Sequence, residues 1–576
     1  MKKIVQRPLP ESVQRGLPEA LHPVLRRVYL TRNVRTDMDL DNSLTRLYSP
    51  SDLKGISTAV DLLAGSLLRQ ERILVVGDFD ADGATSSALM VSVLRAMGAH
   101  SIDYLVPNRF EFGYGLTPEI VAVAADSMPD LIITVDNGIS SLDGVDAARE
   151  RGIRVLVTDH HLPGSELPAA DAIVNPNQPQ DKFPSKNLAG VGVAFYLLMA
   201  LRSRLRENGW FTSRECAEPN LADYLDLVAL GTVADLVHLD HNNRVLVRQG
   251  LQRIRAGHCR PGIRALLEIA GRKTARVVAA DFGFAVGPRL NAAGRLDDMS
   301  LGIECLLAED AGKAQQLAAE LDALNRERRE IEADMKTQAM EYVQQVHVQE
   351  EQLPLGLCLF EPGWHQGVIG ILASRIKERF HRPVIAFARS GPDQLKGSAR
   401  SIAGLHIRDT LDAIAARHPD VLHNFGGHAM AAGLSLAEHK LPVFEAAFLK
   451  ELEARLDDRV LTSVLESDGP LDPEDFNLEL AEQLRSAGPW GQGFPEPLFD
   501  GNFTVLQQRV VGEHHLKLLV RPGGGSQALD AIAFNQAADH QLKEGQQVRL
   551  AYRLDSNEYR GLLGLQLVIE MIELLQ

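Results

Sequence analysis

The sequence predicts a multidomain α/β protein with a parallel-sheet domain, a long helix, a second α/β unit and a small C-terminal β-barrel. Three observations support this class. Short apolar runs that end in Gly or Asp recur in the first half, a long stretch without Pro or Gly follows, and the last part alternates short strands with glycine turns. A chain of 576 residues is too long for one core, and roughly two to four domains are expected.

The apolar runs of the first half are typical of buried parallel strands, and each is followed by acidic or histidine side chains. They are RILVVGDFDADG (72–83), DLIITVDNG (130–138), RVLVTDHH (154–161) and LVALGTVAD (227–235). In an open α/β sheet, ligands bind beyond the carboxyl ends of the strands. The four segments are therefore expected to bring their polar side chains to one edge of one sheet.

These polar side chains are the ligand types that divalent cations prefer. No cysteine lies near them, which argues against a closed tetrahedral zinc site. Carboxylates with one or two histidines suit Mn²⁺, with Mg²⁺ a common substitute. Crowded carboxylates repel one another unless cations neutralise them, and two ions bridged by a shared carboxylate are common in phosphoryl hydrolases. The candidate ligands are Asp78, Asp80, Asp82, Asp136, Asp159, His160, His161 and Asp235.

This pattern predicts metal-assisted hydrolysis of a phosphate ester by two divalent cations, Mn²⁺ or Mg²⁺. Any single Asp at the end of a strand can instead cap a helix or form a turn. The prediction therefore depends on the four segments together.

Composition is that of an ordinary soluble globular protein, with 45% hydrophobic and 24% charged residues. The basic start has no apolar core behind it, no apolar run reaches membrane-spanning length, and four scattered cysteines fit a reducing compartment. A cytoplasmic location without membrane association is expected. The net charge of −16 weakens the case for nucleic-acid binding, although the field inside a cleft is not set by the total.

The remaining elements follow in order along the chain. We expect a lead-in over 1–50 that packs on the first domain, an alternating α/β catalytic domain over 51–310, and a helix over 311–348. At about 1.5 Å per residue this helix would exceed 50 Å. It is either an interdomain strut or an amphipathic helix packed on one domain. A second α/β domain over 349–455 and a small β-barrel over 456–576 complete the chain.

GDFDADG, TVDNG, TDHH and GTVAD resemble the successive motifs of the DHH phosphoesterase superfamily. Later motifs make the chain similar to the bacterial single-stranded-DNA-specific 5′→3′ exonucleases of that superfamily. These are GPRLNAAGR (287–295), WHQGVIGILASR (364–375), LKGSARS (395–401) and FGGHAMAAG (425–433). The resemblance runs from about residue 70 to the C-terminus. It implies a DHH catalytic domain, a DHH-associated substrate-binding domain and a C-terminal OB-fold that binds single strands.

The resemblance also implies roles for individual side chains. Asp80 and Asp136 would hold one ion, and Asp82, Asp136, His160 and Asp235 would hold the other, which makes Asp136 the bridge. His161 would face the scissile phosphate and stabilise the charge that develops there. Asp78 and Asp159 would either bind metal through water or orient a ligand.

Substrate-binding residues are expected in several of the motifs. By the resemblance, Ser398 and Arg400 would contact phosphates, with His428 nearby. An arginine binds phosphate bidentately and a tyrosine can stack on a base, so the residue types add Arg109, Tyr114, Arg289, Asn291 and Arg295 as candidates. The alternative for such residues is a tight turn or a solvated surface. In the barrel, Phe503, His515, Lys517, Arg521, Phe534 and Arg553 are candidates of the same kind.

Composition and spacing alone predict a dinuclear phosphoesterase. The resemblance implies more, a monomeric exonuclease that releases mononucleotides from the 5′ end of single-stranded DNA by a two-metal mechanism. The resemblance implies a role in DNA repair and recombination, with a helicase and a single-stranded-DNA-binding protein as partners. One alternative is a phosphodiesterase for short oligonucleotides or cyclic dinucleotides. Another is a replication scaffold with a dead site, which the complete set of ligands disfavours.

Overall fold

The computed structural model describes residues 3–9, 16–108, 112, 115–350, 353–422, 424–456, 461, 463–559 and 561–575, with only the backbone for 346–350 and 559. The chain divides into two compact units. The larger consists of Gln6–Asp322 and Glu466–Gln576, and the smaller of Met1–Val5 and Ala323–Leu465. The chain passes from one unit to the other within β1 (Lys3–Gln6), the helix α15 (Ala311–Glu350) and β12 (Val464–Ser467).

A five-stranded parallel sheet forms the centre of the catalytic part of the larger unit. Its strand order is β3-β2-β4-β5-β6, and all neighbours are parallel. Because the chain leaves β2 for one edge and then returns to its other side, the carboxyl ends of β2 and β4 form a topological switch point. The strands are β2 (Ile73–Gly77), β3 (Ile102–Leu105), β4 (Leu131–Val135), β5 (Arg154–Thr158) and β6 (Ala172–Val174).

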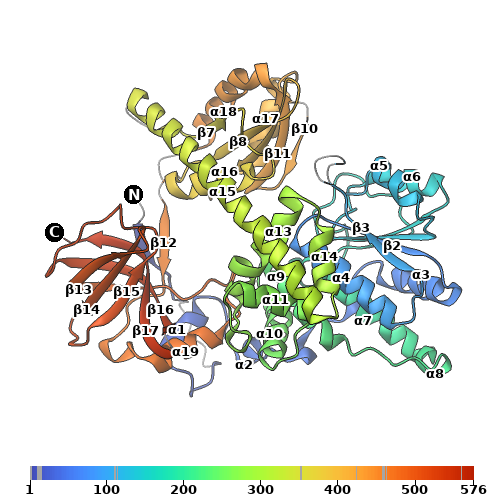
Figure 1. Ribbon diagram of the computed structural model, residues 1–576, viewed down its shortest axis with the longest axis horizontal. Helices are drawn as coiled ribbons and strands as arrows, with labels where there is room; N and C mark the ends of the chain where they lie inside the picture. The colour runs from blue at the N-terminus through green and yellow to red at the C-terminus, as the bar shows by residue number, and fades with distance from the viewer. Residues whose placement is uncertain are drawn as a thin grey trace. The chain divides into compact units, whose positions relative to one another are not determined.

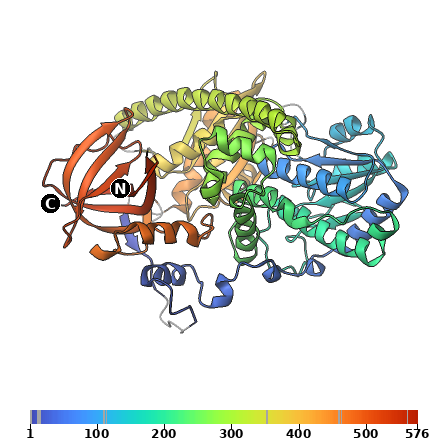
Figure 2. The ribbon, with the colours of Figure 1, turned by 60° about the horizontal axis from the view of Figure 1, so that its bottom comes forward.

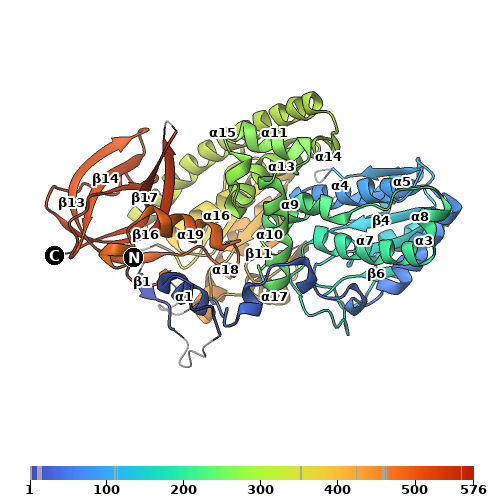
Figure 3. The ribbon, with the colours of Figure 1, turned by 90° about the horizontal axis from the view of Figure 1, so that it is seen from below.

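Helices cover both faces of this sheet, as Figures 1 and 3 show. The helices α3 (Ile56–Arg69), α4 (Ala81–Ala96) and α7 (Gly190–Glu207) contact one face. On the other face, α5 (Pro118–Ala125) and α6 (Leu142–Glu150) enclose a core with alternate strand residues such as Val76, Ile132 and Val157. The central strands β2 and β4 are buried on both faces and are mainly apolar, so the predicted parallel α/β domain is confirmed.

One predicted strand is wrong. The run 227–235 lies in the helix α9 (Leu225–Ala234), and Asp235 is the residue that ends it. Almost every residue of α9 is buried, so the helix is apolar all round and its sequence lacks a helical period. A short apolar run of this kind does not distinguish a buried strand from a buried helix.

Between β6 and α15 the regular elements of the described residues are all helical. The longer helices are α10 (His241–Arg255), α11 (Pro261–Ile269), α13 (Gly287–Leu296) and α14 (Ser300–Leu307). The short elements of this region are α8 (Trp210–Ser213), α12 (Ala279–Asp281) and the one-turn π-helix η5 (Phe282–Val286), whereas α1 (Pro23–Leu30) and α2 (Asp37–Leu40) lie in the N-terminal lead-in. None of the helices that the structure describes is long and apolar enough to cross a membrane.

The long helix is confirmed as α15, which Figure 2 shows as one continuous rod. Its 40 residues correspond to about 60 Å at 1.5 Å per residue. Within the larger unit, Asp322 on α15 pairs with Arg289 on α13 at 2.8 Å.

The smaller unit is the second α/β unit that the sequence predicts. Its sheet has the order β10-β11-β9-β8-β7, in which only β7 and β8 are parallel. Phe387, Phe444 and Phe448 lie at the centre of its core. Its elements are β7 (Leu357–Phe360), α16 (Ile369–Phe380), β8 (Val384–Gly391), β9 (Gln394–Arg400), α17 (Ile407–Arg417), β10 (Asn424–Gly427), β11 (Ala431–Ala437) and α18 (Leu441–Arg455).

The C-terminal strands close into the predicted barrel, in the order β13-β14-β15-β17-β16. The pairing of β15 with β17 is parallel, and the other pairings are antiparallel. Phe499, Phe503 and Tyr552 fill the interior, so Phe503 is a core residue. The elements are α19 (Leu478–Ala487), β13 (Phe499–Val511), β14 (His515–Pro522), β15 (Leu529–Ala533), β16 (Gln547–Tyr559) and β17 (Leu562–Leu574).

The N-terminal lead-in packs on two parts of the larger unit. Residues 39–48 contact α10, as expected. The helix α1 instead packs on the segment that precedes the barrel, where the Tyr29 hydroxyl donates to the carbonyl oxygen of Ala487. Beside it, Arg32 forms a bidentate ion pair with Asp468, with N–O distances of 2.7 and 2.9 Å and both side chains fully buried.

We expect Arg32→Ala to lower the free energy of unfolding by about 3–5 kcal/mol, because it leaves the carboxylate of Asp468 buried without its charged partner. Urea unfolding followed by tryptophan fluorescence measures this change. The matched control is Arg389→Ala, which breaks an exposed pair with Glu438 and is expected to cost far less, because solvent screens exposed pairs. Equal losses in the two variants would contradict the expectation.

Candidate metal centre

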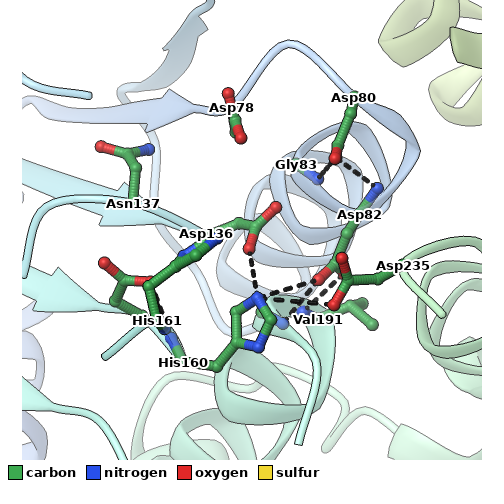
Figure 4. A network of polar contacts seen from close by, with 12 residues as sticks. Asp78, Asp80, Asp82, Gly83, Asp136, Asn137, His160, His161, Val191 and Asp235 are labelled. Atoms are coloured by element: carbon green, nitrogen blue, oxygen red, sulfur yellow. Dashed lines mark hydrogen bonds and ion pairs between the residues drawn. The ribbon is translucent and has the colours of Figure 1, made fainter. Parts of the chain in front are cut away.

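Acidic and histidine side chains from five segments meet at the switch point of the parallel sheet, as Figure 4 shows. They come from the loop after β2, the first turn of α4, the ends of β4 and β5, and the end of α9. The helix α9 thus delivers its carboxylate to the position that a strand end was expected to supply. The group comprises Asp78, Asp80, Asp82, Asp136, His160, His161 and Asp235.

Asp136 lies at the centre of this group. Its backbone is left-handed, with φ of +62°, and its side chain is buried. The Nε2 atom of His160 lies 3.0 Å from Oδ1 of Asp136 and 3.5 Å from Oδ2 of Asp235. The same nitrogen is 4.0 Å from Oδ2 of Asp82. One imidazole therefore lies among three carboxylates.

The ligand atoms fall into overlapping groups that each suit one cation. Asp78, Asp80 and Asp136 form one group, and Asp82, His160 and Asp235 form another, with the ligand atoms of each within 4.8 Å of one another. A third group joins Asp136 to His160 and His161. Asp136 belongs to two of the three, which is the placement expected of a bridging carboxylate.

Electrostatics show that this arrangement fits divalent cations. Burial, together with the charge of Asp80, raises the pKa of Asp82 to about 7. Burial and the neighbouring carboxylates also raise the pKa values of Asp136 and Asp235 well above the usual range. Ionised carboxylates are costly here until positive charge is added, and a bound cation supplies that charge.

We expect the metal-free protein to lose stability as the pH rises from about 4 to about 7. The buried carboxyls have raised pKa values, so in this range the folded state binds more protons than the unfolded state. Each excess proton lowers the free energy of unfolding by about 1.4 kcal/mol per pH unit. Thermal unfolding in EDTA and in Mn²⁺ tests this, since the cation should reverse the trend. A flat profile in EDTA would contradict the expectation.

Local backbone structure fixes two of the carboxylates. Asp82 accepts hydrogen bonds from the backbone N–H groups of Gly190 and Val191, at the positive N-terminal end of α7. Asp80 accepts from the N–H groups of Asp82 and Gly83 and so caps α4. The capping alternative therefore holds for Asp80, which also lies in the first ligand group.

Asp159 faces the backbone and His161 rather than the other carboxylates. Its oxygens accept hydrogen bonds from the N–H groups of His160 and Ile139, and from Nδ1 of His161 at 2.8 Å. Burial acts to lower the pKa of His161, but the hydrogen bond and the charge of Asp159 outweigh it and raise that pKa to about 9. Of the two roles considered for Asp159, this geometry favours orientation of a neighbouring histidine.

Several asparagines at the same sheet edge have structural roles that the sequence analysis did not predict. Asn137 donates to the carbonyl oxygens of Val76 and Val135 and so ties the ends of β2 and β4 together. Asn175 and Asn177 donate to the carbonyl oxygens of His161 and His160. Both follow β6 directly, so a search for polar residues after every predicted strand would have found them.

The candidate substrate-binding residues of α13 make contacts within the protein. Asn291 accepts a hydrogen bond from the N–H of Ala81, at the start of α4, at 2.8 Å. Arg289 is buried and pairs with Asp322. These contacts hold α13 against the acidic loop and against α15. Arg295 is half-buried on the same helix, and Arg109 and Tyr114 lie outside the described residues.

In the smaller unit, Ser398 and Arg400 lie side by side on β9. The guanidinium of Arg400 donates to the Ser398 hydroxyl at 3.0 Å and to the Ser374 hydroxyl at 3.2 Å. Arg400 pairs in the sheet with Ala431, which places the turn that contains His428 beside it. Arg400 forms no ion pair with a carboxylate of the described residues, and burial lowers its pKa, so an anion would stabilise its charge.

The fold and the centre together define a metal-dependent phosphoesterase of the DHH type. Residues 72–232 match the model of the DHH family N-terminal domain, 345–456 that of the DHHA1 domain, and 467–571 that of the RecJ OB domain. The chain belongs to the RecJ family of exonucleases, which are metal-dependent enzymes with Mn²⁺ or Mg²⁺ as cofactor.

Two relatives and one solved structure illustrate the similarity. The single-stranded-DNA-specific exonuclease RecJ of Dickeya dadantii is 58% identical over 97% of both chains. RecJ of Escherichia coli is 56% identical over 96% of both chains. The crystal structure of Thermus thermophilus RecJ with Mn²⁺ has a TM-score of 0.81 and 32% identity, and the match covers 100% of this chain and 79% of that one.

Proposed function

We propose that this protein removes mononucleotides from the 5′ end of single-stranded DNA by a two-metal mechanism. The observation that carries the proposal is the pair of ligand groups that adjoin at Asp136. The names of the relatives support single-stranded DNA as the substrate, and the barrel is of a type that binds single strands. A role in DNA repair and recombination, with a helicase and a single-stranded-DNA-binding protein as partners, belongs to the same proposal.

Asp80 and Asp136, with Asp78 adjacent, would hold one cation. Asp82, His160 and Asp235 would hold the second, with Asp136 shared. When bound, the cations lower the pKa of the attacking water and offset the charge that develops on the phosphate. The protein contributes a fixed ligand geometry, because Asp80 and Asp82 are held by backbone N–H groups before any cation arrives.

His161 would act on the phosphate from beside the cations. Its Nδ1 is held by Asp159, whose hydrogen bond and charge raise the pKa of the imidazole. A protonated imidazole at this position would stabilise the negative charge that develops on the phosphate oxygens in the transition state. Ser398 and Arg400 would bind a further phosphate, since Arg400 carries a charge that no carboxylate of the described residues pairs with.

We also propose the domain boundaries 1–50, 51–310, 311–348, 349–455 and 456–576 for the lead-in, the catalytic domain, the helix, the substrate-binding domain and the barrel. The protein would act as a cytoplasmic monomer. Limited proteolysis tests these boundaries, since cuts are expected near them rather than within the sheets.

The experiment that tests the activity is digestion of a long single strand labelled at either end, in Mn²⁺. The proposal expects the 5′ label to be released first, as a mononucleotide. A control with the dinucleotide separates this enzyme from one for small substrates, because only the latter would cleave the dinucleotide and leave the long strand intact. Release of the 3′ label first would overturn the proposed polarity, and cation binding without any cleavage would indicate a scaffold.

A further inference from the structure

A cavity of about 460 Å³ lies in the larger unit, between the helical part of the catalytic domain and the segment that leads into the barrel. Its walls come from the end of α9, from α10, from α12 and η5, from residues 485–496 and from β16. A volume of this size lies in the range of small-molecule sites. None of the residues assigned to the metal centre or to phosphate binding lines it.

Apolar side chains form much of the wall. Leu251 and Trp490 line the cavity, and Trp490 stacks on Phe494 at 5.0 Å between ring centroids. Leu236 and Phe284 also belong to the lining, although they are 68% and 80% exposed. An exposed leucine and an exposed phenylalanine beside a cavity offer a surface for a flat apolar group.

Leu236 and Phe284 both lie in segments with an unusual backbone conformation. Leu236 has φ of +61°, a conformation that is rare for a bulky residue. Phe284 lies in the single π-helical turn η5, a type of turn that occurs frequently at functional sites. The strain at Leu236 has a cost, and the surrounding fold maintains it next to Asp235.

Arginine side chains supply the charge of this cavity. Arg248 donates to the carbonyl oxygens of Ser486 and Gly488, at 2.5 Å each. The Nε atom of Arg255 donates a hydrogen bond to the carbonyl oxygen of Val277. Among the described residues, neither forms an ion pair with a carboxylate.

The other charged side chains around the cavity do not remove its excess of positive charge. Arg485 also lines it, with Asp555 as an acidic partner at 3.6 Å. Burial, followed by the charges of Arg248 and Arg485, lowers the pKa of Arg255, so the guanidinium groups repel one another. Glu496, the carboxylate in the lining, pairs with Arg553 at 2.6 Å. A bound anion would relieve the repulsion.

The cavity is lined by residues that are next to the metal centre in the chain. Val233 and Leu236 line it, and Asp235 of the metal centre lies between them in the chain. Arg553 on β16 belongs to the barrel and lines the other side. The cavity is therefore bounded by segments of the two parts of the larger unit that the proposed function assigns to single-stranded DNA.

We propose that this cavity binds a nucleotide, with the base against Phe284 and Leu236 and the phosphate on Arg255 and its neighbouring arginines. The inference rests on the proposed function, and it adds a second nucleotide site separate from the cations. The nucleotide is either one unit of the DNA strand or the free mononucleotide that the reaction releases. Both present the same chemistry, an apolar base joined to an anionic phosphate.

Binding to the metal-free enzyme in EDTA tests the cavity without any hydrolysis. The probes are thymidine 5′-monophosphate and a twelve-residue oligothymidylate, measured by calorimetry. We expect Arg255→Gln and Phe284→Ala each to weaken binding of one of these probes by about 10-fold. Phe284→Ala serves as the second variant because so exposed a side chain contributes little to folding. The matched control is Arg253→Gln, on the same helix but outside the lining, which should bind like the wild type.

The two probes separate the sources of the nucleotide. Weaker binding of the oligonucleotide alone assigns the cavity to the DNA strand, and weaker binding of the mononucleotide assigns it to the product. Unchanged binding of both probes to both variants would overturn the inference. The binding assay does not depend on hydrolysis. If the wild type showed no nuclease activity, the proposed function would be rejected, but the test of the cavity would still stand.

Discussion

Asp136→Asn is expected to lower the rate of phosphodiester hydrolysis by more than about 10³-fold while making the metal-free protein more stable. The side chain is buried, and the carboxylates of Asp82, Asp80 and Asp235 act against its ionisation. Asparagine keeps the shape and removes the charge. The variant therefore loses the shared ligand of the metal centre and also the repulsion that the metal-free fold has to tolerate.

Thermal unfolding with and without Mn²⁺ measures both effects. In the wild type, Mn²⁺ at a hundred times its dissociation constant should raise the free energy of unfolding by about 2.7 kcal/mol for each ion bound. In Asp136→Asn the metal-free melting temperature should rise and the response to Mn²⁺ should largely disappear. Asp126→Asn, on the exposed end of α5 in the same domain, is the matched control and should change neither. A lower metal-free melting temperature for Asp136→Asn would show that the carboxylate stabilises the fold by other contacts.

Gly294→Ala is expected to lower the hydrolysis rate by about 10²-fold or more. A Cβ atom at this position of α13 would lie 1.8 Å from the carbonyl oxygen of Phe79, which is backbone of the acidic loop. The loop has to move, and Asp78 and Asp80 move with it. A displacement of about 1 Å at a reacting centre can cost 10²-fold in rate, and overpacking costs about 1–3 kcal/mol in stability.

The rate, the Mn²⁺ affinity and the melting temperature of Gly294→Ala distinguish loop displacement from general unfolding. Gly65→Ala is the matched control, because that glycine also lies within a helix and a Cβ atom there would meet only the flexible end of Arg69. It should keep full activity and gain up to about 1 kcal/mol in stability. A Gly294→Ala enzyme with normal Mn²⁺ affinity and rate would show that α13 does not position the loop.

The sequence was sufficient to predict which side chains gather at the candidate metal centre, because most of them follow strands. Asp78, Asp136 and His160 come after apolar runs of a parallel sheet, and such strand ends necessarily lie at one edge. Asp235 reaches the same place from a helix. The structure brings Asp235 to the other acidic side chains, as expected, although the predicted secondary structure of its segment was wrong, because a fully buried helix carries no periodic signal.

Roles that depend on tertiary contacts were not visible in the sequence. Arg289 and Asn291 have the residue types of phosphate ligands, yet one pairs with Asp322 on α15 and the other holds the start of α4. The arginine cavity was invisible for the same reason. Arg255 and Arg485 are far apart in the sequence, and only the packing of the segment before the barrel brings them to one cavity.

The contact between α1 and the segment before the barrel imposes an order on biosynthesis. Arg32 leaves the ribosome 436 residues before Asp468, the partner that it needs in the finished fold. At about 5–20 residues per second, that interval lasts roughly 20–90 s. During this time Tyr29 of α1 also lacks its native partners Ala487 and Trp490. The helix α1 therefore cannot complete its native contacts until the segment before the barrel has been made, and a chain whose translation stops before residue 468 lacks them altogether.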